Sequence, residues 1–363
     1  MAPLALALEI DGAGSHPAAW RRSASPPSRH LDPDRLRRLG EAVERAGFTL
    51  ATLDDDLLPP AAPAPLGRIG SLERAAFLAE VTSVLGLVPV VSTTYTEPFH
   101  VSSSLAALDH ISHGRAGWIA TGTPDVAAAS AWDRPAVTDV DGLRREAVDG
   151  VRVARALWDS WEDDAVIRDV STSRYLDRDR LHYVDFEGAT YSVKGPATVP
   201  RPPQGHVVTF AAPDLLDPAD VDVALVAGRD VAAVSAAAAD ASAAPRRFAE
   251  VEVALDTPEH TAIERVASLA EITAWPERGR LRHVGTAGGL VRLLADLSAH
   301  VDGVRLHPLV IDEDLAVLSK LVLPRLFIDR TSARPLPGQS LRATLGLARP
   351  HNQFAAVAAA HGG

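Results

Sequence analysis

Gly86-Leu-Val-Pro-Val-Val-Ser-Thr-Thr-Tyr-Thr-Glu-Pro-Phe-His-Val101 and Ala107-Leu-Asp-His-Ile-Ser-His-Gly-Arg-Ala-Gly-Trp118 are the two stretches that decide the fold. Within them, Leu87–Ser92 is an apolar run typical of a strand that is buried on both faces. Pro98–Ile111 is predicted to be a helix and 116–120 a second strand. This succession of strand, loop, helix and strand is the repeating unit of a parallel sheet covered by helices.

The same alternation extends in both directions along the chain. A first strand is predicted at Leu4–Ile10, and Asp32-Pro33-Asp34 opens a helix with a capping aspartate and a proline at the first helical position. Further strands are predicted at 49–53, 207–211, 221–226, 249–255 and 303–307, and further helices at 71–84, 143–161, 259–269, 287–297 and 312–327. Eight strands that alternate with helices predict an α/β fold, a single (β/α)8 TIM barrel.

One domain is expected to cover residues 1–363. The alternation breaks between 162 and 204, where charges, tyrosines and the run Pro-Arg-Pro-Pro (200–203) replace the apolar periodicity. This segment is too short and polar to bury a core of its own, so we interpret it as an insertion on the rim of the barrel. Residues 328–363 are interpreted as a C-terminal arm.

Composition excludes several classes of function. The net charge of −11, with only two lysines, argues against a nucleic-acid or anionic membrane surface. No apolar stretch reaches the roughly 18 residues that a membrane span needs, and no basic segment precedes the apolar start, so a soluble, cytoplasmic protein is expected. The chain has no cysteine, and its His, Asp and Glu residues lack the spacing of a metal site, so no metal is expected.

The 86–118 region resembles luciferase-like, flavin-dependent monooxygenases of the nitrilotriacetate and dibenzothiophene-sulfone branch. Flanking motifs resemble the same family: Glu9-Ile-Asp-Gly-Ala-Gly14, Thr52-Leu-Asp-Asp-Asp-Leu-Leu-Pro-Pro60, Leu157-Trp-Asp-Ser-Trp-Glu-Asp-Asp164 and Arg349-Pro-His-Asn-Gln353. The resemblance touches most of the chain and is weakest between 206 and 300.

The resemblance implies a two-component monooxygenase. A separate flavin reductase would supply reduced FMN, which would react with O₂ and oxygenate a small organic substrate. The flavin would carry the difficult chemistry, while the protein orients it and excludes water. The active site of such a barrel lies at the carboxyl ends of its strands. A homodimer, or a heterodimer with an active paralogue, is expected through the helices at 72–84 and 99–111.

Five residues fall at positions that the family uses for its cofactor: Asp55, Thr93, Thr94, Ile119 and Arg144. A carboxylate at Asp55 can accept hydrogen bonds from flavin N–H groups, although Asp54–Asp56 is equally readable as a solvated loop. The two threonines would reach the flavin ring with their hydroxyls, or bond only within the strand end. Ile119 and Arg144 replace an amide and a tyrosine of the family pattern.

Residue chemistry and position in the chain indicate further candidates, for catalysis and for substrate binding. His100 and Glu97, at the start of the helix after the third strand, are the candidate acid–base pair, because histidine titrates near neutral pH. A histidine that bonds only to its own loop is the alternative interpretation. Asp11, His16 and Trp20, which follow the first strand, are expected to line the substrate pocket. We expect Asp11, His100 and three of the cofactor candidates, Asp55, Thr94 and Ile119, to share one cavity.

The family's phosphate loop is replaced in this chain by Phe210-Ala-Ala-Pro-Asp-Leu-Leu-Asp-Pro218. A phosphate site needs backbone N–H groups, a glycine and a helix N-terminus. Pro213 and Pro218 lack N–H groups, and Asp214 and Asp217 would repel a dianion. Weak or absent FMN binding is therefore expected, unless Arg144 or the glycine-rich turn at 285–289 compensates.

Three interpretations stay open at this point. The first is an active FMN-dependent monooxygenase. The second is a degenerate barrel without flavin chemistry, acting as a non-catalytic partner subunit or as a binding protein for a small ligand. The third is a barrel that uses another cofactor, such as a deazaflavin. The sequence shows no cluster of arginines that would indicate a sulfonate or polycarboxylate substrate, so a neutral organic molecule is expected.

Overall fold

Eight parallel strands close into a barrel in the structure, a computed structural model that describes residues 3–26, 29, 31–59 and 67–355. In order around the barrel, the strands are β1 (Ala5–Glu9), β2 (Leu50–Leu53), β3 (Gly86–Ser92), β4 (Gly117–Thr121), β9 (Val208–Ala211), β10 (Val223–Val226), β11 (Arg246–Leu255) and β13 (Gly303–Pro308). Pairing of β13 with β1, with Ala5 opposite Gly303, closes the ring. The predicted (β/α)8 barrel is confirmed.

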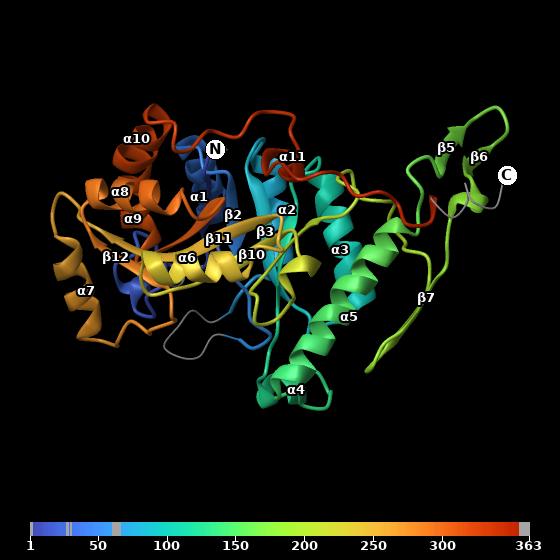
Figure 1. Cartoon of the computed structure of the whole chain (residues 1–363), viewed down its shortest axis with the longest axis horizontal. Helices are drawn as coiled ribbons and strands as arrows, with labels where there is room; N and C mark the ends of the chain where they lie inside the picture. Colours follow the sequence, from blue (N-terminus) through green and yellow to red (C-terminus); the bar gives the residue numbers. More distant parts are fainter. Residues whose placement is uncertain (1–2, 27–28, 30, 60–66, 356–363) are drawn as a thin grey trace.

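Helices cover the outside of the barrel (Figure 1). Asp32 caps α1 (Pro33–Ala46) by accepting a hydrogen bond from the backbone of Asp34, and Gly47 ends it with a φ of 96°. The other α-helices of the described residues are α2 (Ser71–Val81), α3 (Pro98–Ile111), α4 (Val126–Ala131), α5 (Val140–Asp159), α6 (Val231–Asp240), α7 (Ala262–Ala270), α8 (Ala287–Leu297), α9 (Ile311–Val317), α10 (Leu323–Ile328) and α11 (Leu341–Thr344). A π-helical turn at Leu318–Val322 divides the last predicted helix into α9 and α10.

One further strand, β12 (Leu281–Gly285), is missing from the sequence-based prediction. The first half of β11 pairs with β10 and its second half pairs with β12, where Val251 lies opposite Leu281. β12 has no apolar run because Arg282 and His283 interrupt it, and most of its residues are only partly buried. The loop that leads into β12 contributes to the cavity at the barrel mouth.

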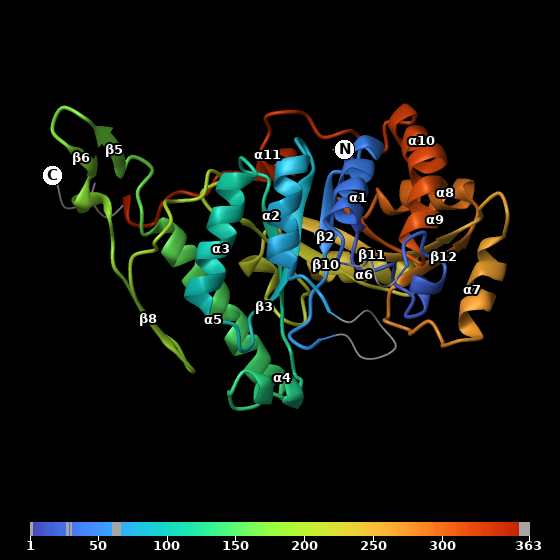
Figure 2. The ribbon, with the colours of Figure 1, turned by 180° about the vertical axis from the view of Figure 1, so that it is seen from behind.

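Two connections between strands depart from the simple alternation. The predicted rim insertion holds two antiparallel hairpins, β5 (Val166–Asp169) with β6 (Arg174–Leu176) and β7 (Val184–Glu187) with β8 (Ser192–Gly195). Figures 1 and 2 show these hairpins projecting beyond α5. The connection from β9 to β10 has no α-helix; a single 3-10 turn (Pro218–Asp220) takes its place.

The C-terminal arm runs from α10 along the amino-terminal ends of the barrel strands to the insertion, as the red segment of Figure 1 shows. Leu341 N donates to Gly114 O at 2.8 Å, and Arg342 Nη1 forms an ion pair with Asp222 at 2.8 Å. Farther along, Arg349 binds Asp163 at 2.6 Å. Residues 356–363 of the predicted arm lie outside the described residues.

Candidate active site at the barrel mouth

The carboxyl ends of the barrel strands surround a cavity of about 750 Å³. This size lies within the range of about 300–1,000 Å³ that is usual for small-molecule sites. The lining comprises Glu9, Asp11, Gly14, Ser15, His16, Pro17, Asp54, Asp56, Leu58, Pro59, Arg68, Val90, Ile119, Thr121, Arg278, Arg280, Arg305, His307 and Pro308. Polar groups of both charges therefore meet at the end of the barrel where enzymes of this fold carry out their chemistry.

Arg305, on β13, organises the floor of this cavity. It forms ion pairs with Glu9 on β1 and, at 3.2 Å, with Glu250 on β11, and it donates to Thr52 Oγ1 at 2.9 Å. Burial raises the pKa of Glu9, against the opposing effect of Arg305. Although burial alone would raise the pKa of Glu250, Arg305, the hydrogen bond from His307 and Arg280 hold that pKa well below its ordinary value. The floor is thus a fixed charge network rather than a set of free acids.

His307 completes the floor beside Arg305. Its Nε2 lies 2.6 Å from Glu250 Oε2, and its Nδ1 lies 3.4 Å from Arg280 Nη1. Because arginine only donates, Nδ1 accepts and the ring proton sits on Nε2, where it is donated to Glu250. Burial lowers the pKa of His307 to about 4, despite the neighbouring Glu250. The imidazole is therefore neutral at pH 7.

The three predicted substrate-pocket residues are placed differently. Asp11 lines the cavity, held by Arg74 Nη1 at 2.5 Å. His16 also lines it, is 1% exposed, and accepts from Ala18 N through Nδ1 at 3.0 Å, which leaves the ring proton on Nε2. Burial, followed by the nearby Arg282, lowers the pKa of His16. Trp20 is outside the lining and stacks with Arg21.

The predicted cofactor residues of the second and third strands lie next to the cavity rather than on its surface. Asp55 accepts from Ser71 N at 2.6 Å at the start of α2, and it is Asp54 and Asp56 that line the cavity. Thr93 Oγ1 donates to Thr121 O at 3.0 Å, and Thr94 Oγ1 accepts from Thr123 N at 3.2 Å. These hydroxyls join the ends of β3 and β4.

The remaining candidates lie on helices α3, α5 and strand β4. Glu97 caps α3 by accepting from Phe99 N and His100 N, and the His100 side chain lies outside the cavity lining. Arg144, on α5, is exposed and donates to Asp214 O at 2.7 Å. Ile119, on β4, lines the cavity. The expected grouping of five residues in one cavity is therefore met by Asp11 and Ile119, and not by Asp55, Thr94 or His100.

The loop between β9 and β10 does not fit a phosphate group. It lacks the helix whose N-terminus would supply donors, and Arg144 is bound to its backbone. A Cβ added to Gly122 would lie 3.2 Å from Leu215 Cδ1 and 3.4 Å from Leu143 Cδ2, so apolar side chains fill the space beside the end of β4. This packing agrees with the absence of glycine between 210 and 218.

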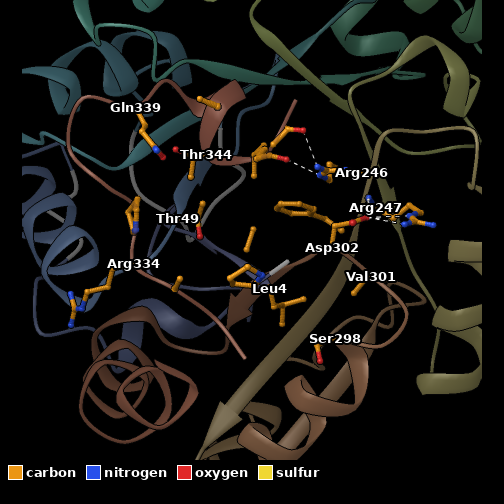
Figure 3. Close-up of a pocket in the computed structure, with 18 of the residues that line it drawn as sticks. Leu4, Thr49, Arg246, Arg247, Ser298, Val301, Asp302, Arg334, Gln339 and Thr344 are labelled. Carbon is orange, nitrogen blue, oxygen red and sulfur yellow. Dashed lines mark hydrogen bonds and ion pairs between the residues drawn. The ribbon is translucent and has the colours of Figure 1, made fainter. Parts of the chain in front are cut away.

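A second pocket, of about 500 Å³, lies at the opposite, amino-terminal end of the barrel (Figure 3). Its arginines are already engaged: Arg246 donates to Leu345 O at 2.7 Å and Gly346 O at 2.9 Å, and Arg247 pairs with Asp302 at 3.1 Å. The contacts of Arg246 attach the C-terminal arm to the barrel. Conserved architecture of this fold places chemistry at the other end, so the mouth cavity is the candidate active site.

Sequence reasoning missed the arginines of the mouth. The expectation that no arginine cluster exists is wrong in three dimensions, because Arg68, Arg278, Arg280 and Arg305 all line the cavity. They come from three segments, around 68, 278–280 and 305, and this separation hides the cluster in the linear sequence. One local signal was available, the alternation Arg278-Gly-Arg-Leu-Arg282.

The described part of the chain contains neither a metal-binding cluster nor a helix that could cross a membrane. Among residues 3–26, 29, 31–59 and 67–355, no group of three or more His, Cys, Asp or Glu side chains is arranged to hold a metal ion. Over the same ranges, no helix combines the length and the apolar character that a membrane crossing requires.

Comparison with known proteins agrees with this geometry. Residues 14–288 match the sequence model of luciferase-like monooxygenases, and the chain belongs to that family. It is 34% identical over 209 residues to N-acetyl-S-(2-succino)cysteine monooxygenase of Bacillus subtilis, covering 57% of this chain and 47% of the relative. It is 33% identical over 215 residues to component A of nitrilotriacetate monooxygenase of Aminobacter aminovorans, covering 55% and 47%. The chain thus spans about half the length of these two curated relatives.

A solved structure shows the same fold. The crystal structure of a riboflavin lyase with modified FMN and the substrate riboflavin superimposes with a TM-score of 0.78, at 22% identity, over 95% of this chain and 96% of that chain. The family resemblance inferred from the 86–118 region is confirmed.

Proposed function

We propose that the chain is the oxygenase component of a two-component monooxygenase that uses reduced flavin to oxygenate a small organic substrate. The observation that carries this proposal is the large polar cavity at the barrel mouth in a member of the luciferase-like monooxygenase family. The names of the relatives support it, because both curated relatives are monooxygenases and one is a component of a larger system.

The residues of the cavity supply binding and shielding. Reduced flavin, when bound, supplies the activation of O₂. Ile119 and Thr121 offer a wall on β4, and Asp54 offers a carboxylate that can accept from a flavin N–H group. Asp55, Thr93, Thr94 and Arg144 are proposed to support this wall from behind, while Asp11 and His16 face the substrate.

Acid–base chemistry is proposed to use a histidine near the cavity. His100 and Glu97 can serve a ligand that extends beyond the lining to the first turn of α3. His16 lines the cavity itself, and its Nε2–H has no hydrogen-bond partner in the described part of the chain. The geometry favours His16 as the group that donates to a bound ligand.

We further propose that FMN binds weakly and without the family's phosphate loop. The β9–β10 loop offers no helix N-terminus, and Leu143 and Leu215 pack where that end of the cofactor is expected. Each lost hydrogen bond to a charged group costs about 1.5–3 kcal/mol, so losing two weakens binding by about a hundredfold or more.

The reaction with oxygen tests the monooxygenase proposal. Reduced FMN is mixed rapidly with air-saturated buffer, with and without an excess of the protein, and reoxidation is followed by flavin absorbance. We expect the protein to change the time course and to lower the release of hydrogen peroxide. Identical time courses at every protein concentration would contradict the proposal.

A second candidate function is a barrel without flavin chemistry, acting as a partner subunit or a small-ligand binding protein. The helix-free β9–β10 connection favours it, because the phosphate end of the site is the part that is lost. A chain that binds a small organic ligand but no reduced flavin would have this second function and not the first.

The proposed partners are a flavin reductase and a second barrel, either a copy of this chain or an active paralogue. The helices proposed for the interface, α2 and α3, pack side by side within the chain (Figure 2). Light scattering at micromolar concentration is expected to give the mass of a dimer, alone or after mixing with the paralogue. A monomer in both cases would rule out this assembly.

A further inference from the structure

The segment Arg278-Gly279-Arg280-Leu281-Arg282, which runs from the loop before β12 into the strand, carries three alternating arginines. It separates the mouth cavity from a smaller recess of about 210 Å³. That recess is lined by Arg229, Glu277, Arg278, Gly279, Arg280 and Arg282, four arginines against one glutamate. Three of these arginines have acidic partners, Arg229 with Glu277 at 3.5 Å and the other two with buried glutamates. Arg278 is the one whose charge has no ion-pair partner among the residues that the structure describes.

Two of these arginines are held in place by buried acids. Arg282 Nη2 lies 2.6 Å from Glu252 Oε2, and its guanidinium stacks 3.8 Å above the ring of Trp275. Arg280 Nε lies 3.0 Å from Glu250 Oε2, and Glu250 also binds Arg305. Because a guanidinium has five N–H donors, both side chains keep donors to spare after these contacts.

Arg278 is the arginine of this loop that is available to a ligand. It is exposed, lines both the mouth cavity and the recess, and has no ion-pair partner among the residues that the structure describes. Gly279, which follows it, adopts a φ of +70°, a left-handed conformation that favours glycine. This turn places Arg278 and Arg280 on the shared boundary of the two spaces.

A second observation at the same corner also points to a ligand. His16 Nε2 and Trp275 Nε1 are buried donors without a hydrogen-bond partner in the described part of the molecule, and their rings are 6.2 Å apart. His16 lines the mouth cavity. Glu252 Oε1 has no hydrogen-bond partner within the described ranges either, but Arg282 neutralises that carboxylate. Unsatisfied buried donors cost free energy, and an oxyanion is the group that satisfies donors.

We propose that Arg278 and Arg280 form an oxyanion subsite at the edge of the mouth cavity, assisted by His16. The ligand group is a carboxylate, sulfonate or phosphate whose organic body lies in the cavity. This subsite rests on the proposed function in one respect, the identity of the ligand. The oxyanion belongs either to the organic substrate or to the flavin phosphate, which the β9–β10 loop does not hold.

Binding of defined probes to the whole chain tests this subsite. Dissociation constants for succinate, and anaerobically for reduced FMN and reduced riboflavin, are measured by calorimetry at constant ionic strength for the wild type and Arg278→Gln. Arg178→Gln is the matched control, because it removes the same charge from an exposed arginine of the insertion. Losing a charged hydrogen bond predicts about tenfold or greater weakening for at least one oxyanion probe in Arg278→Gln alone.

The pattern of losses identifies the source of the oxyanion. Weaker FMN binding with unchanged riboflavin binding assigns the subsite to the flavin phosphate. Weaker succinate binding with both flavins unchanged assigns it to a substrate carboxylate, even if the chain never reacts with reduced flavin. The proposal is overturned if the wild type binds neither succinate nor FMN, or if Arg278→Gln and Arg178→Gln behave alike.

Discussion

Side chains around the barrel mouth differ in whether their hydrogen-bonding groups are already paired within the fold. Asp55 accepts from the backbone of Ser71 in α2, and Thr94 accepts from the backbone of Thr123, just beyond β4. The Nε2–H of His16, a residue that lines the cavity, has no hydrogen-bond partner among the described residues. Because a side chain already bonded within the fold must break that bond to reach a ligand, the free donor of His16 is the better-placed group. His100 has an exposed position instead.

Replacing these two histidines separates the sequence-based assignment from the geometric one. We expect the larger loss of oxygenase turnover for His16→Gln, by about tenfold or more, because an acid–base group that acts on the substrate contributes on that scale or above. Turnover is measured with reduced FMN at saturating concentration, and circular dichroism checks that both variants fold. A larger loss for His100→Gln would restore the pair His100 and Glu97 as the acid–base group.

His307 predicts a specific dependence of stability on pH. Its pKa is about 4 in the folded protein, below the ordinary 6.5, so the unfolded chain binds the proton more tightly. The contribution to the free energy of unfolding is complete above about pH 6.5 and is lost as pH falls toward 4, by about 3 kcal/mol at most. Urea unfolding at several pH values should show a shallower slope for His307→Gln over that window. Parallel slopes for the two proteins would refute this account of His307.

Among the elements, those with strong local signals were predictable. The apolar run of β3 and the capped helix α1 both follow from short-range physical rules, and the structure reproduces both. β12 could not be predicted, because its polar residues are tolerated only where β11 extends past β10 and offers a free edge. The arginines that precede it meet Arg68 and Arg305 through tertiary folding alone.

The β9–β10 connection gives a prediction about flavin affinity. If it no longer holds the flavin phosphate, then removing its negative charge should leave flavin affinity unchanged. We expect Asp214→Asn to alter the dissociation constant of reduced FMN by less than about twofold, like the control Asp240→Asn at the end of α6. A tenfold tightening in Asp214→Asn alone would place the phosphate beside this loop.

At the scale of the whole molecule, the two ends of the barrel have different tasks. The C-terminal arm occupies the amino-terminal end. Its backbone oxygens accept hydrogen bonds from Arg246 in the pocket of Figure 3. The carboxyl end keeps a larger cavity, which is lined by the exposed Arg278 and by His16, whose Nε2–H has no partner within the described ranges. Ligand chemistry is therefore separated from structural attachment along the barrel axis.

The central claim is that the mouth cavity is the flavin-dependent site. Anaerobic titration with reduced FMN tests this claim most directly when two variants with bulky substitutions are compared. Thr121→Trp fills the mouth cavity, and Thr344→Trp fills the pocket at the opposite end. Thr121 contributes its backbone oxygen to the bonds with Thr93, which the substitution leaves in place. We predict saturable binding by the wild type and Thr344→Trp, and its loss in Thr121→Trp. Absence of binding by the wild type, or equal binding by Thr121→Trp, would contradict the claim.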